Sequence, residues 1–148
     1  NVGLDFAQLN FDSKTVTKAS NACIKFRAKI SDITQSKVEL GVIDDANNLV
    51  RFIYDQGASG GNWSSETVSG GTSTSNDTSI VADTNWHIFF IVCSSTTIKF
   101  YVDGILKTTH TTNLPTSLMN IYAKQTSNTT NTRNTLIDFI KVRSDRDS

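Results

Sequence analysis

Glu39 and Glu66 are the only glutamates in the chain and the first candidates for acid–base chemistry. Hydrolysis of a glycosidic bond needs two carboxyl groups about 5 to 9 Å apart, one on each side of the scissile bond. Glu39 has no carboxylate two residues away, where an extended strand would place it on the same face, and Asp44 and Asp45 come only after the strand turns. The sequence therefore assigns Glu39 to the surface or the rim and predicts no hydrolytic pair.

Nucleophilic and metal chemistry have no better candidates. The chain contains no Gly-x-Ser-x-Gly, Cys-His or metalloprotease motif. Cys23 and Cys93 are the only cysteines, and their spacing matches no metal motif. A disulfide between them and two half-buried thiols both stay open.

Aromatic and amide side chains indicate binding instead. A carbohydrate site pairs an aromatic platform for the sugar ring with polar groups for its hydroxyls. Trp63 follows Gly60-Gly61-Asn62 and precedes a polar run, so little nearby sequence would bury it, although packing between two sheets is the alternative. Trp86 begins an apolar run and is assigned to the core. The predicted ligand-binding residues are Trp63, Tyr54, Tyr101 and Asn62.

The elements that position these residues are strands, because apolar and polar residues alternate along most of the chain. Asp103-Gly104 and Gly70-Gly71 supply the conformations that tight hairpin turns require. Trp86–Cys93 and Leu136–Val142 are apolar on both faces, which predicts strands near the centre of a sandwich. The predicted strands are Val2–Phe11, Ala22–Ile30, Lys37–Ile43, Leu49–Tyr54, Asn62–Ser69, Thr72–Val81, Trp86–Cys93, Ile98–Val102, Ile105–His110, Leu118–Lys124 and Thr135–Arg143.

No stretch combines an apolar 3.6-residue period with helix caps, so the fold class is all-β, an antiparallel two-sheet sandwich or jelly roll. The length predicts a single domain over residues 1–148. The first residues, Asn1-Val2-Gly3, are neither a signal peptide nor a natural start, so we expect this domain to be excised or processed from a larger protein. Fourteen basic and fourteen acidic residues balance without a long run of either sign, which argues against nucleic acid as a partner. No apolar stretch reaches the roughly 18 residues of a membrane helix, so we expect no membrane insertion.

Four sequence blocks together resemble the concanavalin A-like lectin/glucanase superfamily, in particular its laminin-G-like jelly-roll modules. They follow in the expected order and cover nearly the whole chain. The blocks are Phe26–Ile30 with Val38–Asp44; Asn47–Asp55; Asp83–His87 leading into Ile98–Gly104; and Thr111–Pro115 closed by Leu136–Val142.

The resemblance implies a concanavalin A-like jelly roll and several expectations about the site. Laminin-G-like modules often hold calcium at a rim, and the turn with Asp44, Asp45 and Asn47 is rich in oxygen donors, although such side chains also stabilise turns by bonding their own backbone. Lyases of this fold need a His and a Tyr, and the available pair would be His87 or His110 with Tyr101 or Tyr122. His87 follows a Trp at a strand entrance, where a structural hydrogen bond fits better than catalysis.

The resulting hypothesis is a non-enzymatic attachment module on an extracellular or virion surface that recognises a glycan or cell-surface polysaccharide. Modules of this kind occur in phage tail fibres and in secreted bacterial proteins. The alternative is a structural capsid decoration or fibre domain that contacts other virion proteins, with Cys23 in an interface of a homo-oligomer. A polysaccharide hydrolase or lyase has the least support in the sequence.

Overall fold

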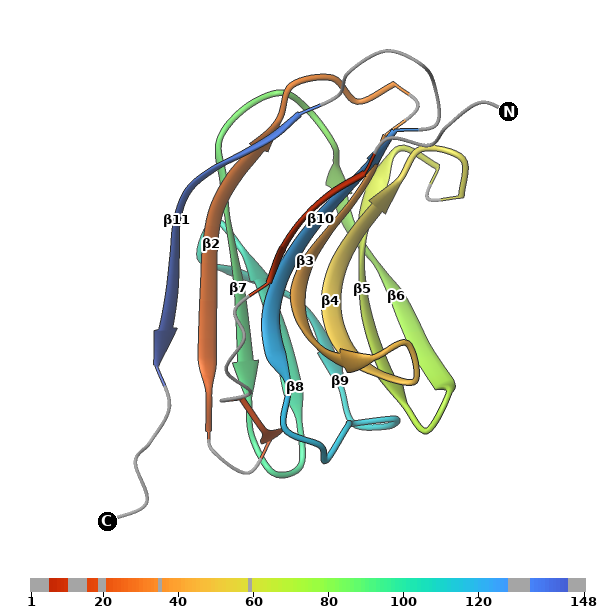
Figure 1. Ribbon diagram of the computed structural model, residues 1–148, viewed down its shortest axis with the longest axis vertical. Coiled ribbons are helices and arrows are strands. Elements are labelled where there is room, and N and C mark those ends of the chain that lie inside the picture. Colours follow the sequence, from red (N-terminus) through yellow and green to blue (C-terminus); the bar gives the residue numbers. More distant parts are fainter. Residues whose placement is uncertain are drawn as a thin grey trace.

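The described part of the chain is almost entirely extended. The computed structural model describes residues 6–10, 16–18, 21–34, 36–58, 60–127 and 134–143. They form two antiparallel sheets packed face to face (Figure 1). In order across the sheet, the six-stranded sheet contains β1 (Phe6–Asn10), β10 (Asn120–Ser127), β3 (Ser36–Asp45), β4 (Asn48–Asp55), β5 (Asn62–Ser69) and β6 (Thr72–Val81). The five-stranded sheet contains β11 (Thr135–Arg143), β2 (Cys23–Ile30), β7 (His87–Cys93), β8 (Ile98–Val102) and β9 (Ile105–His110).

This architecture confirms the predicted all-β sandwich. Each predicted strand has a counterpart in the structure, and Val2 to Asp5 and Phe11 of the first prediction lie outside the described residues. The predicted hairpin turns are present, since Asp103 and Gly104 have φ of 51° and 81°, and Gly70 and Gly71 have φ of 57° and 82°.

The core lies between the sheets because every second side chain of a strand points inward. In β2 the buried and half-buried residues alternate strictly over eight positions. Phe52 of β4 packs edge-on against Phe89 of β7 and Phe100 of β8, with ring centroids 5.2 and 5.1 Å apart. These three rings join the two sheets near the middle of the sandwich.

The two strands whose sequences are apolar at both alternating sets of positions, β7 and β11, occupy different places in the five-stranded sheet. β7 is the middle strand of its sheet, as predicted, but β11 is an edge strand, and its Leu136 is 43% exposed. The strand pairing shifts between Ile137 and Phe139, so the inward residues Ile137 and Ile140 are three positions apart. A β-bulge, rather than central burial, therefore produces the apolar pattern of β11.

Both cysteines are free thiols. Cys93 is buried, and burial raises the pKa of its thiol to about 12. The sandwich therefore forms without a disulfide. Among the described residues there is also no helix of the length and apolarity needed to cross a bilayer.

The two histidines each connect neighbouring strands, and the fold shifts their pKa values in opposite directions. His110 of β9 is buried, and its Nε2 lies 2.9 Å from Ser65 Oγ and 3.2 Å from Asn76 Nδ2, while its Nδ1 lies 3.0 Å from Thr67 Oγ1. Because an amide nitrogen can only donate, Nε2 accepts and the proton lies on Nδ1. Burial lowers the pKa of His110, which favours this neutral form.

His87 contacts two carboxylates instead. Its Nδ1 lies 2.6 Å from Asp103 Oδ2, and its Nε2 lies 3.0 Å from Asp83 Oδ1. Burial alone would lower the pKa of His87, but the hydrogen bonds and charges of Asp103 and Asp83 raise it. Both ring nitrogens are therefore occupied in a structural contact that ties the start of β7 to the β8–β9 turn.

We predict that the free energy of unfolding of His110→Gln falls less on acidification than that of the wild type. The fold holds the pKa of His110 below its ordinary value of 6.5, so the contribution of neutral His110 is complete above that pH. It is lost as the pH falls through the lowered folded-state pKa. Urea unfolding of both proteins between about pH 8 and 5 measures the difference.

His87→Gln is the control, because its effect on stability should depend on pH in the opposite direction. The raised pKa of His87 means that its contribution is complete below the ordinary value and is lost as the pH rises through the folded-state pKa. If the His110→Gln protein loses as much stability on acidification as the wild type does, the assigned role of His110 is wrong.

Candidate functional site

Three charged residues from neighbouring strands meet on the outer face of the six-stranded sheet. Arg51 of β4 lies opposite Gly41 of β3 on one side and opposite Glu66 of β5 on the other. Glu39 lies two residues before Gly41 and points to the same face. The strand order alone therefore places Arg51 between the two glutamates of the chain.

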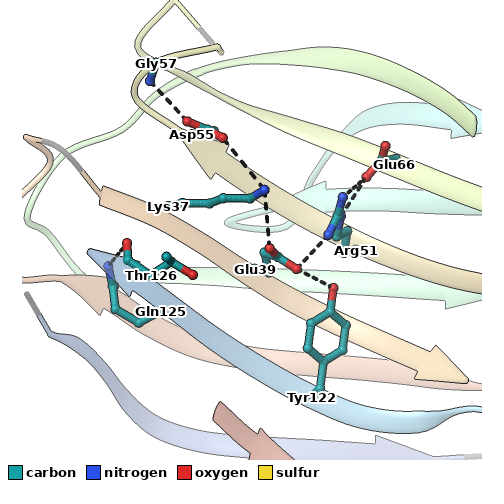
Figure 2. A network of polar contacts seen from close by, with 9 residues as sticks. All are labelled: Lys37, Glu39, Arg51, Asp55, Gly57, Glu66, Tyr122, Gln125 and Thr126. Atoms are coloured by element: carbon teal, nitrogen blue, oxygen red, sulfur yellow. Dashed lines mark hydrogen bonds and ion pairs between the residues drawn. The ribbon is translucent and has the colours of Figure 1, made fainter. Parts of the chain in front are cut away.

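Arg51 bonds both carboxylates (Figure 2). Its Nη1 donates to Glu39 Oε2 at 2.6 Å, and its Nε and Nη2 lie 2.6 and 2.5 Å from Glu66 Oε2. Lys37 Nζ lies 3.7 Å from Glu39 and 3.8 Å from Asp55, which extends the network along the sheet. We call Lys37, Glu39, Arg51, Asp55, Glu66 and Tyr122 the Arg51 network.

Gly41 makes this arrangement possible. Tyr122 of β10 and Arg51 of β4 are the two strand partners of Gly41, so both side chains flank a position that has no side chain of its own. A Cβ atom at Gly41 would lie 2.0 Å from the carbonyl oxygen of Val50 and 2.7 Å from the Cα of Arg51. The backbones therefore approach too closely for any other residue.

Charge and burial together shift the pKa values of Arg51 and Tyr122. Burial alone would lower the pKa of the Arg51 guanidinium, but Tyr122, Glu39 and Glu66 raise it above its ordinary value. Burial raises the pKa of the Tyr122 hydroxyl well above its ordinary value, against the opposing charge of Arg51. Tyr122 therefore stays protonated and donates to Glu39 Oε2 at 3.1 Å.

The two glutamates are held near each other by one guanidinium. Each carboxylate bonds Arg51, so the guanidinium sets the spacing of the two acids. Glycosidases also use two neighbouring carboxyl groups, one on each side of the scissile bond. The side chains of Arg51 and Glu66 are each 16% exposed, so the edge of this pair is open to solvent.

The expectation that Glu39 is a surface or rim residue is wrong. Glu39 is 5% exposed, because Arg51, Tyr122 and Lys37 surround its carboxylate. Carboxylates on one strand share a face, whereas Glu66 reaches this site from a strand two positions across the sheet. Antiparallel pairing of the three consecutive predicted strands, Lys37–Ile43, Leu49–Tyr54 and Asn62–Ser69, is the signal that could have brought the two glutamates together.

The predicted aromatic platform does not face solvent. Trp63 is 2% exposed and packs between the sheets against Phe89 and Tyr54, with ring centroids 4.5 and 5.8 Å apart. Tyr54 is 1% exposed, and its hydroxyl donates to the carbonyl oxygen of Ile33. Both are core residues because they occupy inward positions of β4 and β5, which the polar residues beside Trp63 in the sequence concealed.

The other predicted binding residues lie apart from one another. Tyr101 is on the outer face of the opposite sheet beside Phe90, with ring centroids 5.6 Å apart. Asn62 begins β5, where its Nδ2 donates to Asp77. The structure therefore does not gather Trp63, Tyr54, Tyr101 and Asn62 into one site.

The structure also shows the surroundings of Trp86 and of the turn that was predicted to hold calcium. Trp86, assigned to the core, is 37% exposed. In the turn after β3, Asp45 Oδ1 accepts hydrogen bonds from Asn47 N at 2.8 Å and from Asn48 Nδ2 at 3.2 Å, as a self-stabilised turn would. The described residues contain no group of three acidic, His or Cys side chains that could hold a metal. Calcium at Asp44, Asp45 and Asn47 stays a prediction.

A family model described as the concanavalin A-like lectin/glucanases superfamily matches residues 5–142. No curated protein sequence matches the chain. Among solved structures, a β-1,3-glucanase from Mycobacterium marinum has a TM-score of 0.74 at 9% identity, over 92% of this chain and 67% of the glucanase. This chain thus spans about two thirds of the length of that enzyme.

Two further structures are similar. Alginate lyase AlyC3 in complex with dimannuronate has a TM-score of 0.69 at 12% identity, over 93% of this chain and 69% of the lyase. The homodimeric agglutinin CG-16 from chicken liver has a TM-score of 0.59 at 12% identity, over 94% of this chain and all of the agglutinin. Likeness at this level of identity shows a shared fold.

These structures correct the expectation that the chain is not an enzyme. Two of the three are enzymes built on the same sandwich. The two members of a carboxylate pair need not lie on one strand, since Glu39 and Glu66 come together from two strands.

We predict that Gly41→Ala destabilises the protein by about 2 to 4 kcal/mol, because its Cβ would force the backbones of β3 and β4 apart. Gly57→Ala is the matched control, since a Cβ there meets only Asp55 Oδ1 at 3.6 Å. Urea unfolding of the three proteins gives the free energies. Equal stability of both variants would show that the strands can separate at Gly41 without cost.

Proposed function

Because the chain belongs to the concanavalin A-like lectin/glucanase superfamily, we propose that it binds carbohydrate at the Arg51 network, on the outer face of its six-stranded sheet. Proteins of this fold include a β-1,3-glucanase and an alginate lyase that holds dimannuronate. The observation that carries the proposal is the pair of glutamates fixed by one guanidinium on a partly open sheet face.

The network suits sugar hydroxyls because its members are already oriented. A carboxylate has about four acceptor sites and a guanidinium has five donors, so the bonds within the network leave further sites for a ligand. Lys37 and Asp55, with side chains 33% and 24% exposed, border the buried part and add one donor and one acceptor group at its edge. Fixed polar groups bind a ligand with little loss of side-chain entropy.

Stability alone does not explain the network. Removal of one partner of a buried ion pair typically costs about 3 to 5 kcal/mol, because the remaining charge is left without compensation. Replacement of such a cluster by apolar residues is often neutral or stabilising. A cluster of this kind on an outer sheet face therefore supports a role in binding.

We predict that Arg51→Lys weakens glycan binding about tenfold or more. Lysine keeps the positive charge but cannot bond both carboxylates with a planar fork, so Glu39 and Glu66 lose their fixed positions. A glycan array of neutral oligosaccharides followed by titration calorimetry of the best ligand measures the change. Arg27→Lys is the matched control, because Arg27 also pairs with a carboxylate, that of Asp138, but on the other sheet.

The fold of each variant is checked by urea unfolding. If Arg51→Lys does not fold, Glu66→Gln replaces it, since this change keeps the size of a side chain that is 16% exposed. Unchanged affinity in both folded variants, or equal losses in Arg27→Lys and Arg51→Lys, would rule out the Arg51 network as the site.

A second candidate function is cleavage of the bound glycan by Glu39 and Glu66, which the β-1,3-glucanase of the same fold favours. One carboxyl group would protonate the leaving oxygen and the other would act as base or nucleophile. The Arg51 guanidinium lies between them, so it would have to move aside to admit the scissile bond.

This candidate predicts that the wild-type protein releases new chain ends from a β-1,3-glucan or a polymannuronate. Glu39→Gln and Glu66→Gln should each lower the rate at least a hundredfold, because each removes a group that transfers a proton or attacks carbon. A reducing-end assay measures hydrolysis of either polymer, since hydrolysis leaves one new reducing end for each bond cleaved. Binding without product formation would leave carbohydrate recognition in place and contradict cleavage.

An extracellular or virion-surface location, virion partners and a homo-oligomer stay predictions from the sequence.

A further inference from the structure

The outer face of the five-stranded sheet gathers basic side chains. Outward positions of β2, β8 and β11 carry six of them, and we call this set the basic face: Lys25, Arg27, Lys29, Lys99, Lys141 and Arg143. The described residues at outward positions of the same strands include one carboxylate, Asp138, which pairs with Arg27 at 2.7 Å. The basic face therefore has a local excess of positive charge in a chain whose net charge is zero.

Aromatic rings hold several of these cations in place. Lys25 Nζ lies 4.8 Å from the ring centroid of Phe90, and Lys141 Nζ lies 5.1 Å from that of Phe139. Arg27 and Lys29 lie 4.8 and 5.2 Å from the ring of Trp86, which explains why this tryptophan is on the surface. Such contacts fix the direction of long side chains without neutralising their charge.

Two lysines are paired unfavourably. Lys25 of β2 and Lys141 of β11 are direct partners across the strands, and like charges in this position destabilise a sheet. Within the described part of the chain, neither has a carboxylate within ion-pair distance. An anion between them would relieve this repulsion.

The space for such an anion is present. Lys25, Lys141 and Arg143 line a hollow of about 590 Å³, together with Cys23, Phe90, Ile140 and Val142. This volume lies in the range of small-molecule sites, about 300 to 1,000 Å³. Three cations thus surround a hollow with an aromatic ring beside it.

We propose that this hollow and the surrounding basic face bind an acidic polysaccharide, with carboxylate or sulfate groups of the chain at Lys25, Lys141 and Arg143. The site lies on the opposite sheet from the Arg51 network and does not depend on it. Equal totals of acidic and basic residues in the whole chain conceal this local excess of positive charge on one face.

The shape of the site favours a polysaccharide over other polyanions. A single sugar chain can enter a hollow, whereas a lipid surface or a duplex meets only its rim. A face of five strands is about 19 Å wide, more than the major groove of DNA, which is about 12 Å. Single-stranded nucleic acid binds mainly by stacking bases on aromatic rings, and the rings here carry cations over their faces.

The experiment measures binding of polygalacturonate, dextran sulfate and neutral dextran to the full chain by titration calorimetry at low salt. We expect both acidic polymers to bind, neutral dextran not to bind, and affinity to fall as salt rises from about 50 to 200 mM. The ratio of the two acidic polymers tells whether carboxylate or sulfate is preferred. Lys25→Gln/Lys141→Gln should weaken the better ligand at least tenfold.

Lys18→Gln/Lys107→Gln is the matched control, because it removes the same two charges outside the hollow. Lys25→Gln/Lys141→Gln should leave the binding of neutral oligosaccharides unchanged, which separates this site from the Arg51 network. Equal losses in the two double variants, or an unchanged affinity in Lys25→Gln/Lys141→Gln, would overturn the proposal. Preferential binding of single-stranded DNA, duplex DNA or phosphatidylserine vesicles would overturn the choice of ligand.

Discussion

The protein depends on one constraint, the alternation of side chains along an extended strand. Alternate residues of β2, β4 and β7 fill the space between the sheets, so the remaining residues of the same strands are available to the two outer faces. Arg51 is an example, since it lies between Val50 and Phe52, both fully buried in the core. Substitutions on the outer faces can therefore change binding without disturbing the packing that holds the sheets together.

This alternation explains how much of the fold was predictable. Strand positions and the two glycine-containing hairpins follow from local patterns, and the structure confirms them. The β-bulge near Asp138 and the different positions of Trp63 and Trp86 were not predictable, because each depends on which strands are neighbours. Polar neighbours in the sequence say little about a side chain whose spatial neighbours belong to another strand.

The candidate sites were harder to predict for the same reason. Glu39 lies on β3 and Glu66 on β5, with the whole of β4 between them in the sequence. Lys25 and Lys141 lie near opposite ends of the chain. Pairing of β3 with β4 and β5, and of β2 with β11, brings each set together. The net charge of the whole chain also does not show how charged side chains are distributed between the outer faces of the two sheets. One sheet carries carboxylates around an arginine, while the other carries lysines and arginines held against aromatic rings.

The free thiols give the molecule a practical property. Cys93 is buried and its thiol is protonated at neutral pH, whereas Cys23 is half-buried on the wall of the hollow in the basic face. A thiol-reactive fluorophore should therefore attach to a single position without any engineered cysteine. That position lies beside Lys25 and Arg143, where the emission of an environment-sensitive dye would respond to whatever enters the hollow. The natural sequence thus already contains the attachment point for an optical reporter.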